Sequence, residues 1–401
     1  MTDHEVDRGR AAAHKRVLVL GAYGTANLGD EAILESLLNT LARSPEPTRV
    51  TVLSTDERAT TEQYGVPAVF GGWRRHLLRK IRLFRESDLL ICGGGGLLHD
   101  TFPNRLVRGA APRYSFLMLL ARLLGCRVAV YAQGIGPLRT RYGRWISSLA
   151  LRSAHLVTVR DAGSAEVVRD ITRSRVRAHV GADPAVLLDP IPKDDVAPLV
   201  ELAGFIGRGE KDDSRPLVAV CPRPWFHRRD IWPDGEPLSA NYVENLRQIV
   251  SGLCRDVDCR VFLVPFDYHE DLPLCRDIEQ RAGRTRNLRV VDTPLRPREM
   301  MGLLSAVDLL VGTRLHSLIF AARVGVAPLA IVYDPKVARF MEQIGRTEAS
   351  FPIESLDPAA VLDGARRTLL EFPTAARRSD EARDRLVARA RSAEELLLQL
   401  L

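Results

Sequence analysis

Short apolar runs alternate with longer stretches of helical periodicity from Arg16 onward. The first series of runs predicts strands at 17–21, 50–53, 88–92, 127–132 and 156–159, with helices at 30–43, 114–124 and 143–153. A second series predicts strands at 217–221, 260–264, 288–291, 308–311 and 327–332. Strands that are apolar throughout and separated by helices are typical of parallel sheets covered on both faces. The pattern therefore predicts an α/β protein with two Rossmann-like, doubly wound parallel-sheet domains that face a cleft.

The segment between the two series is rich in Pro, Gly and charge, which indicates a linker over 189–215. We accordingly expect a flexible N-terminal arm over 1–15, an N-terminal domain over 16–188 and a C-terminal domain over 216–375. Residues 376–401 predict a C-terminal helix that packs across one domain. Its apolar stripe consists of Leu386, Leu396, Leu397 and Leu400.

Composition and charge limit the kinds of molecule that we expect the protein to bind. The chain of 401 residues carries 57 basic and 50 acidic side chains, a net charge of +7, and only 6% of its residues are aromatic. This mild, dispersed excess suits an acidic substrate or a membrane surface and argues against nucleic acid. The six cysteines form no CxxC pair and have no histidines at zinc spacing, so we expect no metal site. No apolar run reaches the roughly 18–20 residues that span a bilayer, and the polar N-terminus is no signal peptide, which predicts a cytoplasmic protein.

The first predicted strand ends in GAYGTANLGDEAIL, a glycine turn that leads into a helix. The spacing of its glycines fits neither a dinucleotide fingerprint nor a P-loop, because Asp30 and Glu31 stand where a P-loop has its lysine. Two interpretations remain open. Asn27 or Asp30 caps the helix, or Asn27, Asp30 and nearby backbone N–H groups line the cleft and bind sugar hydroxyls or an anion.

The next polar positions follow two other strands. The strand 88–92 is followed by four glycines, including Gly94 and Gly95, and then by His99. Consecutive glycines indicate either a strained turn or the close approach of a ligand. His99 is either a ligand contact or a satisfied structural residue. The later YAQGIGP segment places Gln133 after a strand as well, and we expect its side chain to point at the cleft.

A cationic cluster gives the strongest local signal. Arg160 ends one predicted strand, Arg314 and His316 lie where another strand turns into a helix, and Lys336 follows the next strand. A helix N-terminus attracts anions, and an arginine there adds bidentate recognition of carboxylate or phosphate. We therefore expect a small, multiply charged anion at this position. The alternative for Arg314 is a structural pair with an acid such as Asp308 or Asp334.

These segments, in this order, resemble the polysaccharide pyruvyl transferase family. The resemblance spans 17–345 and rests on GAYGTANLGDEAIL, DLLICGGGGLLHD, AQGIGP, TVRDAGS, GADPAVLL and GTRLHSLIFAARVGVAPLAIVYDPK. It implies a fold like the two-domain glycosyltransferase-B (GT-B) architecture, phosphoenolpyruvate as donor and a sugar diol as acceptor. By the same resemblance, Arg160, His316 and Lys336 match positions that hold or activate phosphoenolpyruvate, and Arg314 adjoins them. It implies no cofactor and no metal.

The resemblance suggests a mechanism. Arg160, Arg314 and Lys336 would neutralise the donor, and His316 would protonate its methylene carbon as general acid. One sugar hydroxyl would then attack C2, phosphate would leave, and a second hydroxyl would close the ketal. Asp183 or Asp30 would deprotonate the hydroxyls; the sequence favours neither.

The sequence leaves two alternatives for contact between the protein and a membrane. Residues 73–85 (WRRHLLRKIRLFR) are either an interfacial helix at the inner face of the membrane, suited to a lipid-linked acceptor, or a packed surface helix.

The class of protein also leaves alternatives. Nucleotide-sugar transferases of this architecture hold the ribose with a carboxylate in the second domain, and here Arg314 and His316 stand at that place. A GT-B glycosyltransferase with a nucleotide-sugar donor and a non-catalytic anion- or glycan-binding protein nevertheless remain as alternatives.

Overall fold

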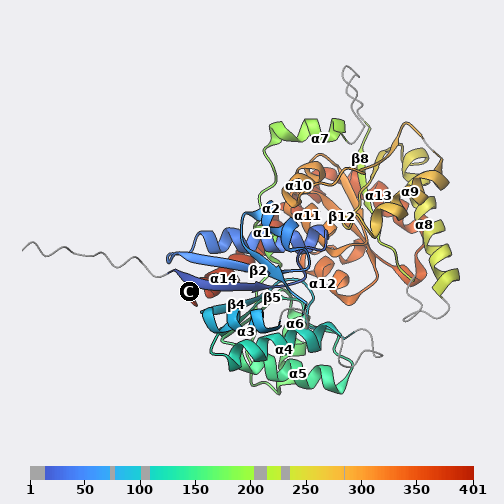
Figure 1. The fold of residues 1–401 in the computed structure, drawn as a ribbon. Helices are drawn as coiled ribbons and strands as arrows, with labels where there is room; N and C mark the ends of the chain where they lie inside the picture. The colour runs from blue at the N-terminus through green and yellow to red at the C-terminus, as the bar shows by residue number, and fades with distance from the viewer. Residues whose placement is uncertain (1–13, 73–76, 101–108, 203–214, 227–234, 284) are drawn as a thin grey trace, which may run out of the picture.

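The computed structural model describes residues 14–72, 77–100, 109–202, 215–226, 235–283 and 285–401. In this part of the chain, each half forms its own parallel sheet, flanked by helices on both faces (Figure 1). The predicted fold class is therefore confirmed. The predicted domain boundaries and the flexible arm stay predictions, although the first strand already begins at Lys15.

The N-terminal sheet has the strand order β3-β2-β1-β4-β5-β6-β7. Its strands are β1 (Lys15–Leu20), β2 (Thr48–Ser54), β3 (Ala68–Phe70), β4 (Leu89–Gly93), β5 (Arg127–Gln133), β6 (Leu156–Val159) and β7 (His179–Val180). Strand β1 pairs with β2 through Val17↔Val50 and with β4 through Val17↔Leu89. The order along the chain reverses between β1 and β4, so a crevice forms at their carboxyl ends.

Two layers of helices cover this sheet because alternate residues of each strand point to opposite faces. Leu18 and Leu20 of β1 pack with α3 to α6, whereas Val17 and Val19 pack with α1 and α14. The first layer is α3 (Leu77–Glu86), α4 (Ala110–Leu123), α5 (Arg141–Ser153) and α6 (Ala162–Thr172); the second is α1 (Leu28–Ala42), α2 (Glu57–Tyr64) and α14 (Phe372–Leu398).

The C-terminal sheet has the order β10-β9-β8-β11-β12-β13, with its own reversal between β8 and β11. Its strands are β8 (Leu217–Cys221), β9 (Arg260–Leu263), β10 (Leu288–Val290), β11 (Leu309–Gly312), β12 (Ala327–Val332) and β13 (Ser350–Pro352). The helices around it are α8 (Gly235–Arg255), α9 (Asp271–Ala282), α10 (Pro297–Ser305), α11 (Leu315–Arg323), α12 (Pro335–Gln343) and α13 (Pro358–Leu370).

The two halves share a packed interface. Leu28 and Ala32 of α1, with Val186 of the short 3-10 helix η1 (Pro184–Leu187), belong to the same apolar cluster as the C-terminal core. The backbone N–H of Leu28 also donates to the carbonyl of Phe266 at 2.9 Å. Within the predicted linker, the chain forms η2 (Lys193–Asp195) and α7 (Val196–Leu202) before its undescribed part.

Two further expectations concern the C-terminal helix and the segment 73–85. The C-terminal helix packs on both halves rather than on one, because Leu386 joins the C-terminal core and Leu397 joins the core of the N-terminal sheet. In the segment 73–85, residues 73–76 lie outside the described part. In the remainder, Phe84 is fully buried against the sheet, so this side of α3 packs in the core, and contact of the segment with a membrane stays a prediction.

Two further findings concern the cysteines and the membrane-spanning capacity of the helices. All six cysteines are free and buried, as expected for small core residues. Among the described helices, none combines the length and apolarity needed to cross a bilayer.

Candidate active site

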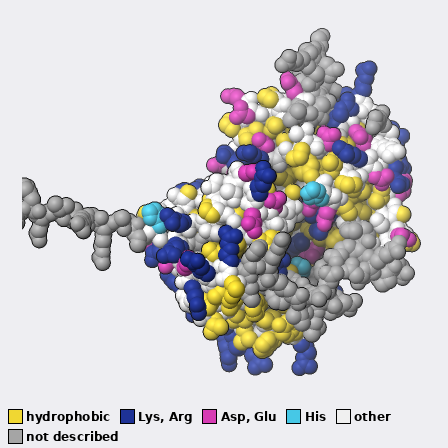
Figure 2. Space-filling model, viewed as in Figure 1, with side chains coloured by type: hydrophobic (Ala, Val, Ile, Leu, Met, Phe, Trp, Pro, Cys, Tyr) yellow, Lys and Arg dark blue, Asp and Glu magenta, His cyan; other side chains and the backbone are white. Residues whose placement is uncertain are grey.

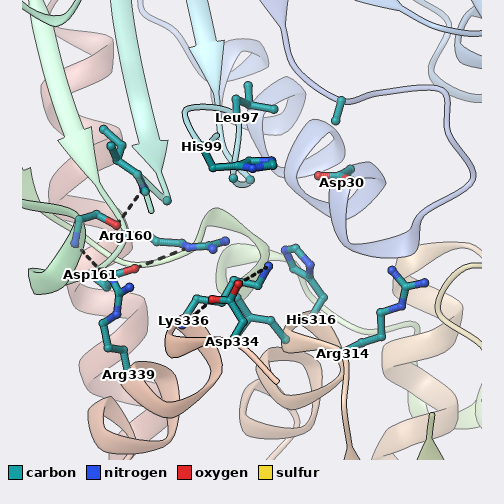
Figure 3. A pocket seen from close by; sticks show the side chains of 18 of the residues that line it. Asp30, Leu97, His99, Arg160, Asp161, Arg314, His316, Asp334, Lys336 and Arg339 are labelled. Carbon is teal, nitrogen blue, oxygen red and sulfur yellow. Dashed lines mark hydrogen bonds and ion pairs between the residues drawn. The ribbon is translucent and has the colours of Figure 1, made fainter. Parts of the chain in front are cut away.

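A pocket of about 310 Å³ lies between the two halves, at the carboxyl ends of both sheets. Ligand sites of doubly wound folds form at this edge, where the strand order reverses. Figure 3 shows His316 from α11 and Arg160 from the end of β6 pointing toward one another, below Asp30 and His99. The described residues that line the pocket are Ala22, Asn27, Asp30, Gly95, Gly96, Leu97, His99, Gly134, Ile135, Gly136, Pro137, Arg160, Asp161, Ser164, Arg223, Phe266, Arg314, Leu315, His316, Tyr333, Asp334, Lys336 and Arg339.

The N-terminus of α1 supplies one wall. Asn27 is its N-cap, and its side chain accepts a hydrogen bond from the N–H of Gly29 at 3.0 Å. Asn27 therefore caps the helix and also lines the pocket. Capping and ligand contact are thus compatible for this residue, and its contact with a ligand stays a prediction. Gly29 lies against the His316 ring, and a Cβ at this position would overlap that ring. The glycine thus lets a histidine from the other half of the molecule approach the helix backbone.

A buried carboxylate joins the two halves beside His316. Asp183 lies just after β7, and its Oδ2 accepts a hydrogen bond from Arg160 Nη1 at 3.2 Å. The same oxygen lies 3.6 Å from Nε2 of His316, which has no hydrogen-bond partner among the described residues. The backbone N–H of Ala185 also donates to Asp183. Asp183 thus sits behind the pocket wall, where it orients Arg160 and faces the imidazole.

The surroundings of the two candidate bases, Asp183 and Asp30, shift their pKa values in opposite directions. Burial alone would raise the pKa of the Asp183 carboxyl, but His316 and Arg160 hold this pKa at about 2. For Asp30, burial dominates and raises the pKa, with Asp183 adding to the rise and His316 opposing it. Asp183 is therefore a fixed negative charge, whereas Asp30, on the pocket wall, has the greater affinity for a proton.

Arg314 has a structural partner, as in the second of the two interpretations given from the sequence, although the acid is a different one. Its guanidinium contacts the buried Asp271 through Nε at 3.0 Å and Nη2 at 2.6 Å, and Glu270 through Nη2 at 2.9 Å. Burial alone would lower the pKa of Arg314, but Asp271 raises it. The two acids considered from the sequence, Asp308 and Asp334, are not these partners. In Figure 3, Arg314 is turned away from Arg160 and His316.

A second group of cations lies around Tyr333, which follows β12 directly. Arg223 donates from Nη1 to the Tyr333 hydroxyl at 2.6 Å, and Lys336 Nζ lies 5.2 Å from the ring centroid. Burial alone would raise the pKa of Tyr333, but Lys336 and Arg223 lower it below its usual range. The ion pair of Lys336 with Asp334 is loose, at 4.0 Å. Lys336 therefore lines the pocket with only a loose partner, and its role in anion binding stays a prediction.

Two residues expected to line the pocket do not. Gly94 has φ +53°, and a Cβ there would overlap Ile33 of α1, so the residue is packed against the core rather than open to a ligand. Gln133 is fully buried, and its amide donates to the carbonyls of Cys92 and Gly94, at 3.3 and 2.8 Å. The side chain holds the glycine loop and does not point at the pocket. Gly95, in contrast, lines the pocket next to Asp30.

His99 lines the pocket opposite the cations. Burial lowers the pKa of its imidazole, and Lys336 lowers it further. A neutral ring can accept a hydrogen bond as well as donate one. The role of His99 as a ligand contact stays a prediction.

The pocket residues that escaped the sequence-based prediction include Arg223, Tyr333 and Arg339. Arg339 donates from Nη1 to Asp161 at 2.8 Å, across the interface between the halves. Arg223 and Tyr333 each stand one or two residues beyond the end of a predicted strand. The strand-end rule that selected Arg160 and Lys336 would have found both. Among the described residues, no cluster of three His, Cys, Asp or Glu side chains is arranged to hold a metal.

Comparisons with solved structures show which type of fold this is. The UDP-GlcNAc 2-epimerase of Methanocaldococcus jannaschii matches over 96% of this chain and 99% of its own, with a TM-score of 0.62 at 11% identity. MnaA of S. aureus, in complex with UDP, matches over 97% and 98% with a TM-score of 0.61 at 12% identity. Anabaena Alr3699/HepE, solved with UDP and glucose, matches over 96% and 99% with a TM-score of 0.58 at 14% identity. The fold is thus of the GT-B type.

The sequence comparisons give the family. Residues 27–335 match the family model of the polysaccharide pyruvyl transferases. The amylovoran biosynthesis protein AmsJ of Erwinia amylovora is 20% identical over 393 residues, which cover 86% of this chain and 90% of AmsJ. The chain therefore belongs to the polysaccharide pyruvyl transferase family.

The pairing of Arg314 predicts a loss of stability on its removal. Arg314→Met leaves the buried carboxylate of Asp271 without its cationic partner, which costs roughly 3–5 kcal/mol in the free energy of unfolding. Urea denaturation measures this cost. The double variant Arg314→Met/Asp271→Asn should recover a part of it, because the amide is neutral and its oxygen can still accept from the backbone N–H groups of Phe266 and Asp267. A single variant as stable as the native protein would contradict the structural role.

The pKa of Asp183 predicts an acid-dependent contribution to stability. The folded pKa of about 2 lies below the ordinary value of 3.8, so the stabilisation is complete above pH 4 and disappears as the pH falls through 2. About 1 kcal/mol should already be lost at pH 3. The stability difference between the native protein and Asp183→Asn, measured by denaturation at pH 6 and at pH 3, should shrink by this amount. A constant difference would refute the assignment.

Proposed function

We propose that this protein transfers the pyruvyl group of phosphoenolpyruvate to two hydroxyls of a sugar in a polysaccharide or lipid-linked glycan precursor, forming a pyruvate ketal and releasing phosphate. The observation that carries the proposal is the cluster of Arg160, His316 and Lys336 on one pocket. Its cations match a small anion with two charged groups, and its histidine can supply a proton. Membership of the family supports pyruvyl transfer in polysaccharide synthesis.

Donor binding would rest on the cations whose geometry leaves them directed at the pocket. Lys336 and Arg223 flank Tyr333, and Arg160 uses one guanidinium nitrogen for Asp183. Gly134 lies against the Arg160 guanidinium, where a Cβ would overlap it, so the glycine makes room for this side chain. Arg314 would contribute its charge from the pocket wall while its hydrogen bonds remain with Asp271 and Glu270.

In the reaction, protonated His316 donates a proton to the methylene carbon of the donor, and C2 becomes electrophilic. The first sugar hydroxyl adds to C2 and loses its proton. The C2–O bond to phosphate then breaks, and the second hydroxyl adds to C2 and loses its own proton. Asp30 accepts each of these protons in turn and passes one to the departing phosphate and the other back to His316. The carboxylate of Asp183 balances the positive charge that the imidazole carries before it donates its proton and after it is protonated again.

The base is Asp30 rather than Asp183. Asp30 lines the pocket and its pKa is raised, whereas Asp183 lies behind the wall with its pKa held at about 2. A carboxylate with a higher pKa accepts a hydroxyl proton more readily. The pKa shifts and the pocket position thus favour Asp30 for this role, where the sequence favours neither acid.

The role of His316 is tested by substitution. His316→Ala should fold normally and lose about 10²–10⁴-fold in turnover, the usual contribution of general acid–base catalysis. Turnover is measured as phosphate released from phosphoenolpyruvate in the presence of glycosides that offer vicinal or 4,6-hydroxyl pairs. The exposed His269, outside the pocket, provides the control His269→Ala.

Near-native turnover of His316→Ala would refute the assignment. A native protein that binds phosphoenolpyruvate but releases no phosphate with any glycoside would instead favour the non-catalytic binding protein.

The donor is tested by thermal-shift titration with phosphoenolpyruvate, and with UDP- and GDP-sugars in parallel. A donor at about 100 times its dissociation constant adds roughly 2.7 kcal/mol of stability. Phosphoenolpyruvate should stabilise the native protein, and Lys336→Met should lose most of the shift. The exposed Lys193 gives the matched control Lys193→Met. Stabilisation by a nucleotide sugar alone would favour the glycosyltransferase; two neighbours of the same fold have been solved with UDP.

A further inference from the structure

One helical layer of the N-terminal half exposes an unusual set of large apolar side chains. Of the six large apolar side chains that are exposed among the described residues, four lie on α3, α4 and α5. They are Leu78 (83% exposed), Phe116 (41%), Leu123 (82%) and Trp145 (57%). Helix α4 packs against both α3 and α5, so the three helices form one continuous layer.

The same layer is strongly basic. Helices α4 and α5 carry five arginines and no Asp, Glu or Lys, although the chain has 50 acids in all; Arg144 of α5 pairs with Asp170 of α6 at 2.7 Å. Of these arginines, Arg141 and Arg152 are exposed on α5, and α3 adds the exposed Arg79 and Arg85. Glu86 on α3 is neutralised by Arg82 at 2.8 Å. Figure 2 shows hydrophobic side chains gathered where Figure 1 places α4 and α5, with Lys and Arg bordering them.

We propose that the outer face of α3, α4 and α5 docks on an anionic lipid bilayer. Single large apolar side chains that protrude between arginines suit the interfacial zone, where apolar groups enter the acyl boundary and arginines meet lipid phosphates. The buried stripe of α3 takes no part, because Phe84 packs inward; the contact is made by the opposite, exposed side of the layer.

The docking face is connected to the pocket. The N–H of Ala111 in the first turn of α4 donates to the carbonyl of His99, which lines the pocket. Thr140, the N-cap of α5, donates to Asp100 at 2.8 Å, next to His99. Both helices therefore begin beside the pocket. On the proposed function, docking would place the pocket near the head groups of a lipid-linked acceptor, but the docking itself does not depend on catalysis.

Vesicle co-sedimentation tests the docking. The native protein should bind vesicles of phosphatidylcholine with one quarter phosphatidylglycerol, bind pure phosphatidylcholine at least 10-fold more weakly, and be released by added salt. Leu123→Glu/Trp145→Glu should lose at least 10-fold in affinity for the anionic vesicles. Leu370 on α13 is equally exposed, at 84%, so Leu370→Glu is the matched control and should bind normally.

A second measurement separates insertion from simple charge attraction. All six native cysteines are buried, so a thiol introduced by Leu123→Cys or Leu370→Cys can be labelled selectively with an environment-sensitive fluorophore. The label at 123 should shift to the blue on anionic vesicles, and the label at 370 should not.

Three results would overturn the proposal: no binding to anionic vesicles, equal binding by Leu123→Glu/Trp145→Glu, or a native dimer in light scattering that this variant dissociates. The last result would assign the face to a second copy of the chain. None of these results depends on phosphate release, so they leave the test of the proposed reaction independent.

Discussion

A buried negative charge at the junction of the two halves organises this molecule. The Asp183 carboxylate is withdrawn from water, and such a charge is tolerated only when partners compensate it. Arg160 from the N-terminal sheet supplies a hydrogen bond, and His316 from the C-terminal half faces the same oxygen at 3.6 Å. The carboxylate therefore joins the packed interface and the Arg339–Asp161 ion pair in holding the two halves together, and it lies beside the imidazole in the pocket.

Two glycines make room for functional side chains of the site. His316 reaches the backbone of α1 because Gly29 has no side chain, and the Arg160 guanidinium fits because Gly134 has none. In both cases, a residue from one segment occupies the volume that a Cβ of another would fill. The glycines of this chain thus accommodate side chains of the protein itself: Gly94 makes room for Ile33 in the core, whereas Gly95 and Gly96 line the pocket.

The long strands and the strand-end cations could be predicted because both depend on local patterns. Apolar runs such as that of β8 are buried throughout, and parallel strands bring Arg160 and Lys336 to one edge. Strands β3, β7 and β13 escaped because two or three residues show no periodicity. The partner of Arg314 escaped because Asp271 is 43 residues away, and Gln133 was misplaced because alternation along a strand does not tell which face a residue takes beyond its end.

The C-terminal helix has a consequence for the order in which the protein can be assembled. Ala393 and Leu397 of α14 complete the core between β1, β5 and α1, although these elements lie in the first third of the chain. Domains commonly fold as they leave the ribosome, N-terminal first. Here the first sheet cannot close its core until residue 397 has emerged, so during synthesis it must wait, with one apolar face uncovered, for the other half to be made.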